Sequence, residues 1–305
     1  DGSDNSFDNY NTLISGPGSN GKYRIMGNQN TANWITGSNF NDGGNFKNGA
    51  TSSNNSALPM PVTLLRFASS VARTETRGIL YNTQVADRGW IGGVGEIIGL
   101  SATPSTSDRQ KIEGYLANKW GLSLAHDHPY KVSPPLAWSS SLQSSQDLVS
   151  GATNIGTGKE GFYGTTISGL TAGETYHYRI RSQGKLNPKG ISGSNLNLWL
   201  DAEDTSTITH SSNAVSKWQD KSGNGKHATQ ASSSSKPTYT VSNSLLNNKS
   251  SVSSSSQNGS IGLDLPSTSL QEIFVVAYYK DGSDDSFDNY NTLISGPGGD
   301  GKYRI

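Results

Sequence analysis

The sequence predicts an all-β protein with a long internal repeat, and three observations support this. Runs such as "NLNLWLDA" at 195–202 and "EIFVVAYY" at 272–279 are typical of strands, and turn residues separate them. The chain is rich in Ser, Thr, Asn and Gly, which suits sheets whose outer faces meet water. The first 25 residues return at 281–305 with three differences, at an offset of 280 residues. This near-identity indicates either a window on a longer tandem array or two terminal copies that serve assembly.

The remaining elements follow from local patterns. Further strands are expected at 62–70, 77–82, 94–101 and 291–296, and a strand, a turn and a longer strand within 165–184. The stretch "STSDRQKIEGYLANKWG" at 105–121 predicts a helix, because Ser105 or Ser107 can cap its start and Gly121 can close it. Its buried face is expected to consist of Ile112, Tyr115, Leu116 and Trp120. Gly114 lies inside this helix at a cost of about 1 kcal/mol relative to Ala.

Composition excludes several classes of function. Six Trp and thirteen Tyr argue against a disordered chain. The formal net charge is zero and no basic stripe is present, which argues against nucleic acid as a partner. No apolar run reaches the roughly 18 residues that a membrane-spanning helix needs. The absence of Cys rules out a disulfide scaffold and favours an extracellular or cell-surface protein.

Four motifs connect the chain to a known family. "LWLDAEDTSTIT", "VSKWQDKSGNGKHATQ", "DRGWIGGVGEIIGLS" and "KIEGYLANKWGL" resemble the laminin-G-like, concanavalin A-like jelly rolls of secreted bacterial proteins. Between them, "GLTAGETYHYRIRS" is similar to a fibronectin type III domain, a small immunoglobulin-like sandwich. The resemblance implies a jelly-roll core that contains Trp90, Trp120, Trp199 and Trp218.

The motifs occur in reversed order. In the family the "LWLDA" strand comes first and the "YLANKWG" helix last, so 196–305 resembles the front half of one jelly roll and 1–130 the back half of another. The segment 131–195 would be a short fibronectin III-like spacer. Residues 1–25 and 281–305 would compete for one strand position. We therefore expect the two halves to belong to different sandwiches, each completed by a neighbouring copy through an interface above about 2,000 Å².

No pattern in the sequence indicates catalysis. The Glu-x-Asp-x-x-Glu pattern of related glycoside hydrolases is absent, and Glu96 and Glu272 stand singly, as structural or edge residues. No G-x-S-x-G nucleophile motif accompanies His126, Asp127 and His128, for which a role in packing is favoured. His227 is expected to support a turn. The sequence predicts that the protein is not an enzyme.

A loop rich in Asp is the candidate metal site. It contains Asp281, Asp284, Asp285 and Asp288, and its copy keeps Asp1, Asp4 and Asp8. Hard oxygen ligands in a Gly- and Ser-rich loop suit Ca²⁺, although the loop departs from an EF-hand. A solvated acidic hairpin tip is the alternative. Calcium is the only cofactor that the sequence indicates.

Two functions follow as hypotheses. The first is a structural repeat unit of a large extracellular bacterial filament, adhesin or stalk, whose partners are neighbouring copies of itself. The second is a calcium-assisted, lectin-like module that binds polysaccharide through Tyr10, Trp34 and Tyr290, which lie near expected turns.

Overall fold

The computed structural model describes most of the chain in several stretches. These are residues 45–51, 59–81, 89–135, 169–175, 187–255 and 261–280, together with the backbone of four short strands. The chain divides into two compact units, one formed by 1–135 with 187–305 and the other by 136–186. In the smaller unit the description covers 169–175, which turns at Ala172 and Gly173.

Strands dominate the larger unit, so the all-β prediction is confirmed. A three-stranded sheet contains β1 (Tyr10–Thr12), β2 (Ile25–Asn28) and β3 (Thr31–Thr36). The main sheet contains β4 (Asn45–Lys47), β5 (Ala50–Thr51), β6 (Met60–Ile79), β7 (Gly92–Leu100), β8 (Leu196–Asp201), β9 (Ile208–Ser211), β10 (Ala214–Trp218), β11 (Ala228–Thr229), β12 (Thr238–Asn243), β13 (Lys249–Ser254), β14 (Leu263–Tyr279) and β15 (Ile294–Ser295). The α-helices of the described residues are α1 (Thr106–Trp120) and α3 (Pro188–Ser192). Within the same residues, four short 3-10 helices lie at Gly193–Asn195, Thr205–Thr207, Ser233–Ser235 and Ser244–Leu246.

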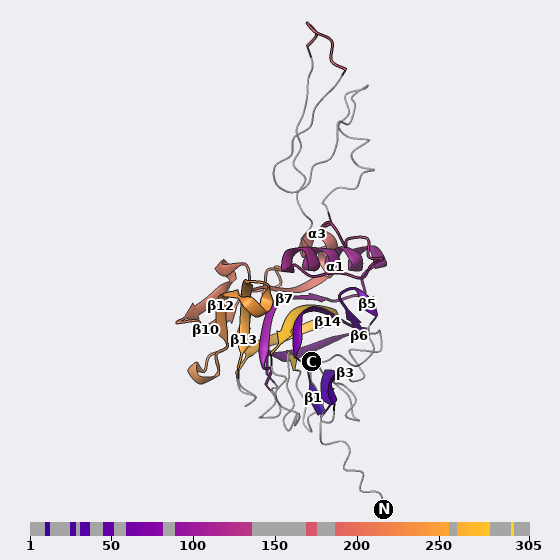
Figure 1. Cartoon of the computed structure of the whole chain (residues 1–305). Coiled ribbons are helices and arrows are strands. Elements are labelled where there is room, and N and C mark those ends of the chain that lie inside the picture. The colour runs from indigo at the N-terminus through magenta and orange to yellow at the C-terminus, as the bar shows by residue number, and fades with distance from the viewer. Residues whose placement is uncertain are drawn as a thin grey trace, which may run out of the picture. The chain divides into compact units, whose positions relative to one another are not determined.

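The main sheet curls so that some of its strands form a closed ring. Its order is β5-β4-β6-β14-β11-β10-β12-β13-β7-β8, and β14 also pairs with β7. The strands β14, β11, β10, β12, β13 and β7 therefore return to their starting point, and β6 and β8 extend the sheet beyond the ring (Figure 1).

The long strand β14 is buried on both faces. It pairs antiparallel with β6 on one side and β7 on the other, so its backbone lies in the middle of the sheet. Ile273, Val275 and Ala277 face one core, and Phe274 and Val276 face another. Burial on both faces explains why the sequence here is a continuous apolar run rather than an alternating one.

Two apolar cores result from this arrangement. The inner core includes Val94, Val215, Trp218, Tyr239 and Val252 and lies among the strands of the ring. The helix-side core includes Ile98, Ile112, Leu116, Trp120, Trp199 and Phe274 and lies between α1 and the opposite face of the sheet. The expected burial of Trp90, Trp120, Trp199 and Trp218 is confirmed.

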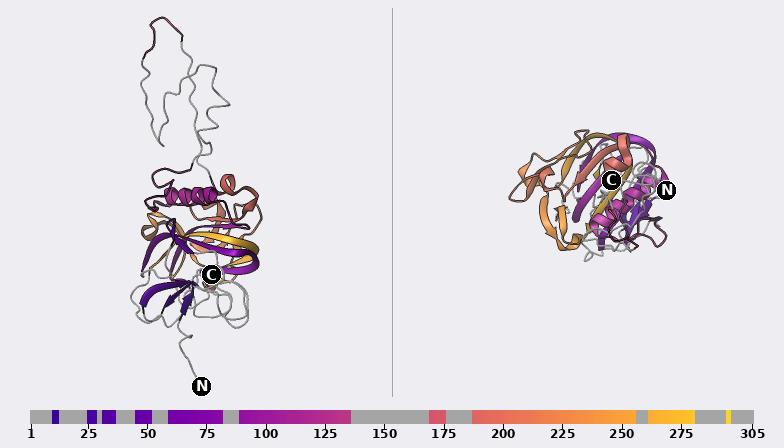
Figure 2. Two further views of the ribbon diagram at one scale, coloured as in Figure 1. Left: turned by 90° about the vertical axis from the view of Figure 1, so that its right-hand side faces the viewer. Right: turned by 90° about the horizontal axis from the view of Figure 1, so that it is seen from above.

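Helix α1 matches its prediction and covers the sheet. The Ser105 side chain accepts a hydrogen bond from the Asp108 backbone N–H, which caps the start, and Gly121 ends the helix at φ 66°. Figure 2 shows the helix lying across the strands. Gly114 is required here, because a Cβ at this position would lie 2.3 Å from the Cβ of Tyr130.

Two expected strands are joined into one. The segment 62–70 and residues 77–79 of the segment 77–82 belong to the single strand β6, and its register with β14 is irregular between Ala68 and Arg73. The bulge contains Ser69 and Ser70, two polar residues that end the apolar run predicting the first strand.

The expected separation of the two halves is wrong for the described residues. Strand β8, from 196–305, pairs with β7, from 1–130, and β14 pairs with β6 and β7 in the same chain. In the terminal copies, β1 (Tyr10–Thr12) pairs with β2 and β15 (Ile294–Ser295) pairs with β6, so these two strands use different parts of the repeated sequence. One chain therefore completes the sheet by itself.

Candidate functional site

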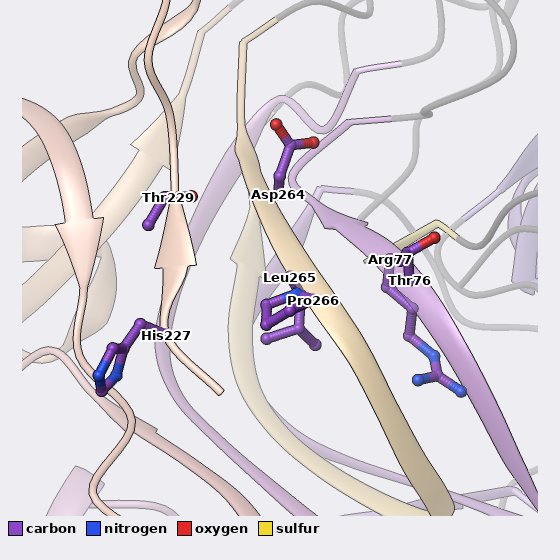
Figure 3. Close-up of a pocket in the computed structure, with 7 residues that line it drawn as sticks. All are labelled: Thr76, Arg77, His227, Thr229, Asp264, Leu265 and Pro266. Carbon is purple, nitrogen blue, oxygen red and sulfur yellow. The ribbon is translucent and has the colours of Figure 1, made fainter. Parts of the chain in front are cut away.

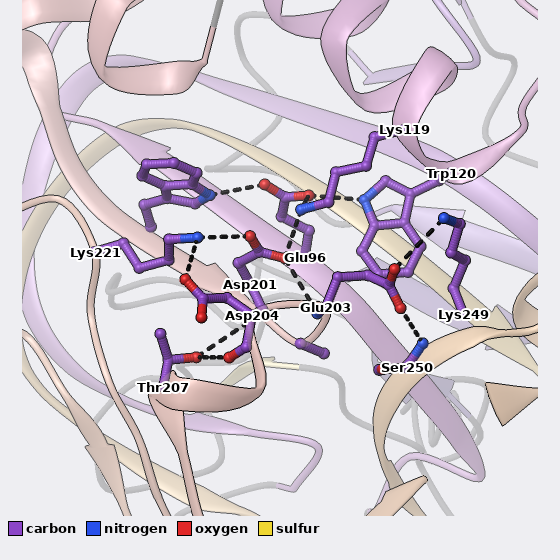
Figure 4. A network of polar contacts seen from close by, with 12 residues as sticks. Glu96, Lys119, Trp120, Asp201, Glu203, Asp204, Thr207, Lys221, Lys249 and Ser250 are labelled. Carbon is purple, nitrogen blue, oxygen red and sulfur yellow. Dashed lines mark hydrogen bonds and ion pairs between the residues drawn. The ribbon is translucent and has the colours of Figure 1, made fainter. Parts of the chain in front are cut away.

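The most connected polar site is a buried cluster between α1 and the sheet. We call it the Glu96 cluster, and its members are Glu96, Tyr115, Lys119, Trp120, Trp199, Asp201 and Lys221. Figure 4 shows Glu96, Lys119, Trp120, Asp201 and Lys221 gathered at this site. Strand β7 supplies Glu96, β8 supplies Trp199 and Asp201, and α1 supplies Tyr115, Lys119 and Trp120.

Glu96 lies at the centre of this cluster and is fully buried. Its Oε1 accepts hydrogen bonds from the Tyr115 hydroxyl at 2.9 Å and from Trp199 Nε1 at 2.7 Å. Its Oε2 accepts from Lys119 Nζ at 2.8 Å and from Trp120 Nε1 at 2.7 Å. Burial raises the pKa of Glu96, and the nearby Lys119 ammonium opposes this rise.

Asp201 faces Glu96 directly across the β7–β8 pair. Lys119 Nζ donates to Asp201 Oδ1 at 2.5 Å as well as to Glu96, so one ammonium bridges the two carboxylates. Lys221 Nζ donates to Asp201 Oδ2 at 2.8 Å and lies 2.7 Å from Asp204 Oδ2. Burial would lower the pKa of Lys221, but its hydrogen bonds to Asp201 and Asp204 outweigh burial and raise it.

The pair of carboxylates does not resemble a hydrolytic site. A glycosidase needs one carboxyl group as acid and another as nucleophile or base, and both must reach the sugar. Here Glu96 has no exposed surface and Asp201 is 4% exposed, and four donors occupy the oxygens of Glu96. The arrangement holds the helix against two strands, and it offers no oxygen for a substrate.

Two further buried carboxylates lie where α1 meets the sheet, Glu272 on strand β14 and Glu113 on the helix itself. Glu272 of β14 forms an ion pair with Arg66 of β6, and the Arg66 guanidinium stacks 3.9 Å from the centre of the Phe46 ring. Glu113 of α1 lies 3.0 Å from His128 Nε2. Burial raises the pKa of Glu272, and Arg66 opposes this rise. The predicted packing role of His128 agrees with its burial.

The turn after β10 is organised by Asp220. Its carboxylate accepts hydrogen bonds from the backbone N–H groups of Trp199, Ser222 and Lys226 at 2.9–3.0 Å. The Asp220 N–H in turn donates to His227 Nδ1 at 3.0 Å. His227 therefore supports a turn, as the sequence predicts.

A shallow pocket of about 390 Å³ opens where β6, β11 and β14 meet (Figure 3). It is lined by Thr76, Arg77, His227, Thr229, Asp264, Leu265 and Pro266. Asp264 accepts a hydrogen bond from the Tyr81 hydroxyl, and burial lowers the pKa of Arg77 to about 10. No Trp, Tyr or Phe is among the lining residues, so the pocket lacks the flat apolar surface on which sugars stack.

The predicted binding residues lie outside the side chains that the structure describes. Asp1, Asp4, Asp8, Asp281, Asp284, Asp285, Asp288 and Tyr290 fall outside the described residues, and Tyr10 and Trp34 belong to strands described by backbone alone. Within the described part of the chain, no group of three or more His, Cys, Asp or Glu side chains could hold a metal ion. Calcium and sugar binding stay predictions.

The sequence did not identify the Glu96 cluster as a unit, although it contained the signal. Each of the four motifs contributes at least one member, for example Glu96 in "GEIIG", Lys119 in "ANKWG" and Lys221 in "QDKSG". Charged residues embedded in apolar motifs indicate buried partners, because a lone buried charge is costly. The partners themselves come from distant segments.

Two further findings concern the whole chain. Among the described residues, no helix has the length and apolar character needed to cross a membrane. Comparisons with protein-family models, curated proteins and solved structures gave no match.

Proposed function

We propose that this chain is a structural repeat unit of a large extracellular bacterial filament, adhesin or stalk. In this proposal the larger unit is a concanavalin A-like jelly roll, and 136–186 belongs to a fibronectin III-like spacer. Neighbouring units would be copies of the same sequence.

The observation that carries the proposal is the return of residues 1–25 at 281–305. The larger and smaller units together span all 305 residues, so the larger unit includes both copies, and the described strands of its main sheet lie within 45–295, a stretch shorter than the 280-residue offset. A sheet that is completed within one period can be repeated along a chain without further partners, as in other repeat proteins.

The polar chemistry of the larger unit supports a structural role. The donors of the Glu96 cluster satisfy a buried carboxylate, and the Asp220 turn uses its carboxylate on backbone N–H groups. These groups hold elements together, because their carboxylate oxygens are engaged by donors from neighbouring strands, turns and the helix.

Imaging of the native protein tests the proposal. Antibodies raised against this chain should label filaments or stalks on the surface of the source cells, at regular intervals along each filament. Labelling confined to the cell interior, or to particles without a repeat, would contradict a structural array.

A glycan array tests the lectin-like alternative. The structural proposal expects no saturable binding to any glycan, with calcium or with a chelator. The lectin-like alternative expects saturable binding that is lost in the chelator and in the variant Trp34→Ala. The control variant Ser107→Ala, which changes an exposed residue, should keep that binding. This result would replace the proposal with a carbohydrate-binding function.

A further inference from the structure

The end of β6 accepts a strand from the C-terminal copy of the repeat. Ile294 pairs with Ile79 and Ser295 with Gly78, in antiparallel orientation. On its other side the same end of β6 pairs with β14, through Leu263 and Asp264. Ile79 and Leu263 are fully buried in the inner core. Strand β15 thus covers backbone groups that would otherwise form an open edge next to the core.

The N-terminal copy carries the same strand sequence. The stretch "NTLISGPG" occurs at 11–18 and again, unchanged, at 291–298. Backbone hydrogen bonds provide the affinity in strand addition, and the alternating side chains provide the specificity. Both are the same for the two copies, so this edge of β6 cannot distinguish Ile14 and Ser15 from Ile294 and Ser295.

The chain therefore carries the donor sequence twice, and among the described residues the end of β6 is the edge that accepts it. We propose that the edge of β6 at Gly78 and Ile79 also binds Ile14 and Ser15 of a second copy of this chain, in place of its own Ile294 and Ser295. Such exchange links copies by strand addition. The inference rests on the proposed function, because it supplies the contact through which neighbouring units would join.

Concentration decides which donor is bound. The chain's own donor is covalently joined to the acceptor strand, so its effective concentration greatly exceeds that of a free second chain in dilute solution. A free second chain in dilute solution therefore competes poorly, whereas a copy held nearby in an array or at high concentration competes well. Association between chains should increase with protein concentration and when the chain's own donor is weakened.

Photo-cross-linking of the full chain tests the exchange and leaves β6 unaltered. A photoreactive amino acid replaces Ser15, and ¹⁵N-labelled chains are mixed with unlabelled chains before illumination. We expect mixed-isotope dimers whose cross-link maps to the peptide around Gly78 and Ile79. The same probe at Ser295 should map to this peptide within one chain.

Two matched proline variants sharpen the result, because proline removes a donor N–H from a strand ladder. Ile294→Pro should increase the Ser15 dimer about tenfold by weakening the tethered donor. Ile14→Pro should abolish that dimer. Circular dichroism of each variant, compared with the unsubstituted chain, verifies that the sheet is intact.

Some outcomes would overturn the exchange. Cross-links from Ser15 that stay within one isotope, or that never reach the end of β6, exclude a second copy as the occupant. If these cross-links are absent but antibodies still label filaments at regular intervals, the proposed structural array is supported and only the strand exchange is excluded. If the dimers form but no filament is labelled, the exchange stands and the proposed function fails.

Discussion

At the scale of single residues, Glu96 explains why a polar group lies under the helix. A buried carboxylate is tolerated when each oxygen accepts strong hydrogen bonds, and Glu96 has four donors from two elements, α1 and β8. Two of these donors are the indole N–H groups of Trp120 and Trp199, which can donate a hydrogen bond but not accept one. The carboxylate therefore fixes the positions of Trp120 and Trp199.

Replacing Glu96 by Gln tests this role. The amide keeps one carbonyl oxygen but turns its NH₂ group toward donors, so buried N–H groups lose their acceptor. We expect a loss of about 3 kcal/mol or more in the free energy of unfolding, measured by urea denaturation. The exposed Asp127→Asn should change this free energy by less than about 0.5 kcal/mol. Equal values for the two variants would contradict a central role for Glu96.

The buried Glu272 gives a prediction for pH. Burial raises its pKa above the ordinary value of 4.5, so the folded chain binds this proton more tightly than the unfolded chain does. Its contribution to stability is therefore greatest below pH 4.5 and decreases as the pH rises through the raised pKa.

Urea denaturation between pH 4.5 and pH 8 checks this contribution. We expect Glu272→Gln to flatten the decline in the free energy of unfolding over this range, since Gln does not titrate. Asp127→Asn should follow the pH profile of the unsubstituted chain. A decline in Glu272→Gln as steep as in the unsubstituted chain would assign the pH dependence to other groups.

At the scale of elements, the contact between α1 and the segment that follows it requires glycine at position 114, because there is no room for a side chain there. Gly114 faces Tyr130, and the clash of an added Cβ would be with another Cβ, which cannot rotate away. Gly114→Ala gains about 1 kcal/mol in helix propensity but overpacks the contact by about 1–3 kcal/mol. We expect a net loss of stability in thermal unfolding.

The control for this helix is Ser107→Ala, which changes an exposed position in its first turn. It should alter the free energy of unfolding by less than about 0.5 kcal/mol. A gain in stability for Gly114→Ala would mean that Tyr130 moves aside at little cost.

Elements were predictable from the sequence where their signals are local. Helix α1 followed from Ser105, the apolar face and Gly121, all within one short stretch. The join within β6 was missed because the apolar run of the first strand ends in the bulge between Ala68 and Arg73. Helix α3 was missed because Asn187 and Pro188, its cap and first residue, are a weak signal for so short a helix.

The candidate site was less predictable, for a physical reason. Sequence could show that Glu96, Lys119 and Asp201 are charges inside apolar motifs, but not that they meet. Lys119 and Asp201 are 82 positions apart, and their contact depends on the β7–β8 register. Sequence reasoning about the two halves was wrong because it did not foresee that β8 and β14 pair with β7 and β6 of the same chain.

At the scale of the whole molecule, the larger unit is discontinuous in the sequence. Its two parts, 1–135 and 187–305, are joined by the β7–β8, β6–β14 and β7–β14 ladders and by both cores. A cut within 136–186 removes the covalent link but none of these contacts. We expect that a chain cleaved at a protease site inserted there still elutes as one species in size exclusion.

Denaturant provides the control for this experiment. In urea above the unfolding midpoint, the cleaved chain should separate into two fragments, and removal of urea at sufficient concentration should restore the single species. Fragments that separate without denaturant would show that the spacer, rather than the sheet, holds the two parts together.

The pairing of β6 with β14 also decides how the unit bears mechanical load. Met60 and Tyr279 are partners in the ladder, and the chain runs from them toward its two ends. Strands β4 and β15 also pair with β6, so tension on the two ends first detaches these short strands. It then enters the β6–β14 ladder at one end and opens its hydrogen bonds one after another. The variant Asp264→Cys would introduce a single attachment point near the opposite end of the ladder, because Asp264 pairs with Gly78. Tension between this Cys and the N-terminus would load all the hydrogen bonds of the β6–β14 ladder together, in shear. In single-molecule force spectroscopy, pulling on the two ends should thus unfold the unit at the lower force. A filament of such units would lengthen under tension as single units unfold, before the extended covalent chain carries the load. It would therefore be extensible and would dissipate mechanical energy, rather than behave as a rigid rod.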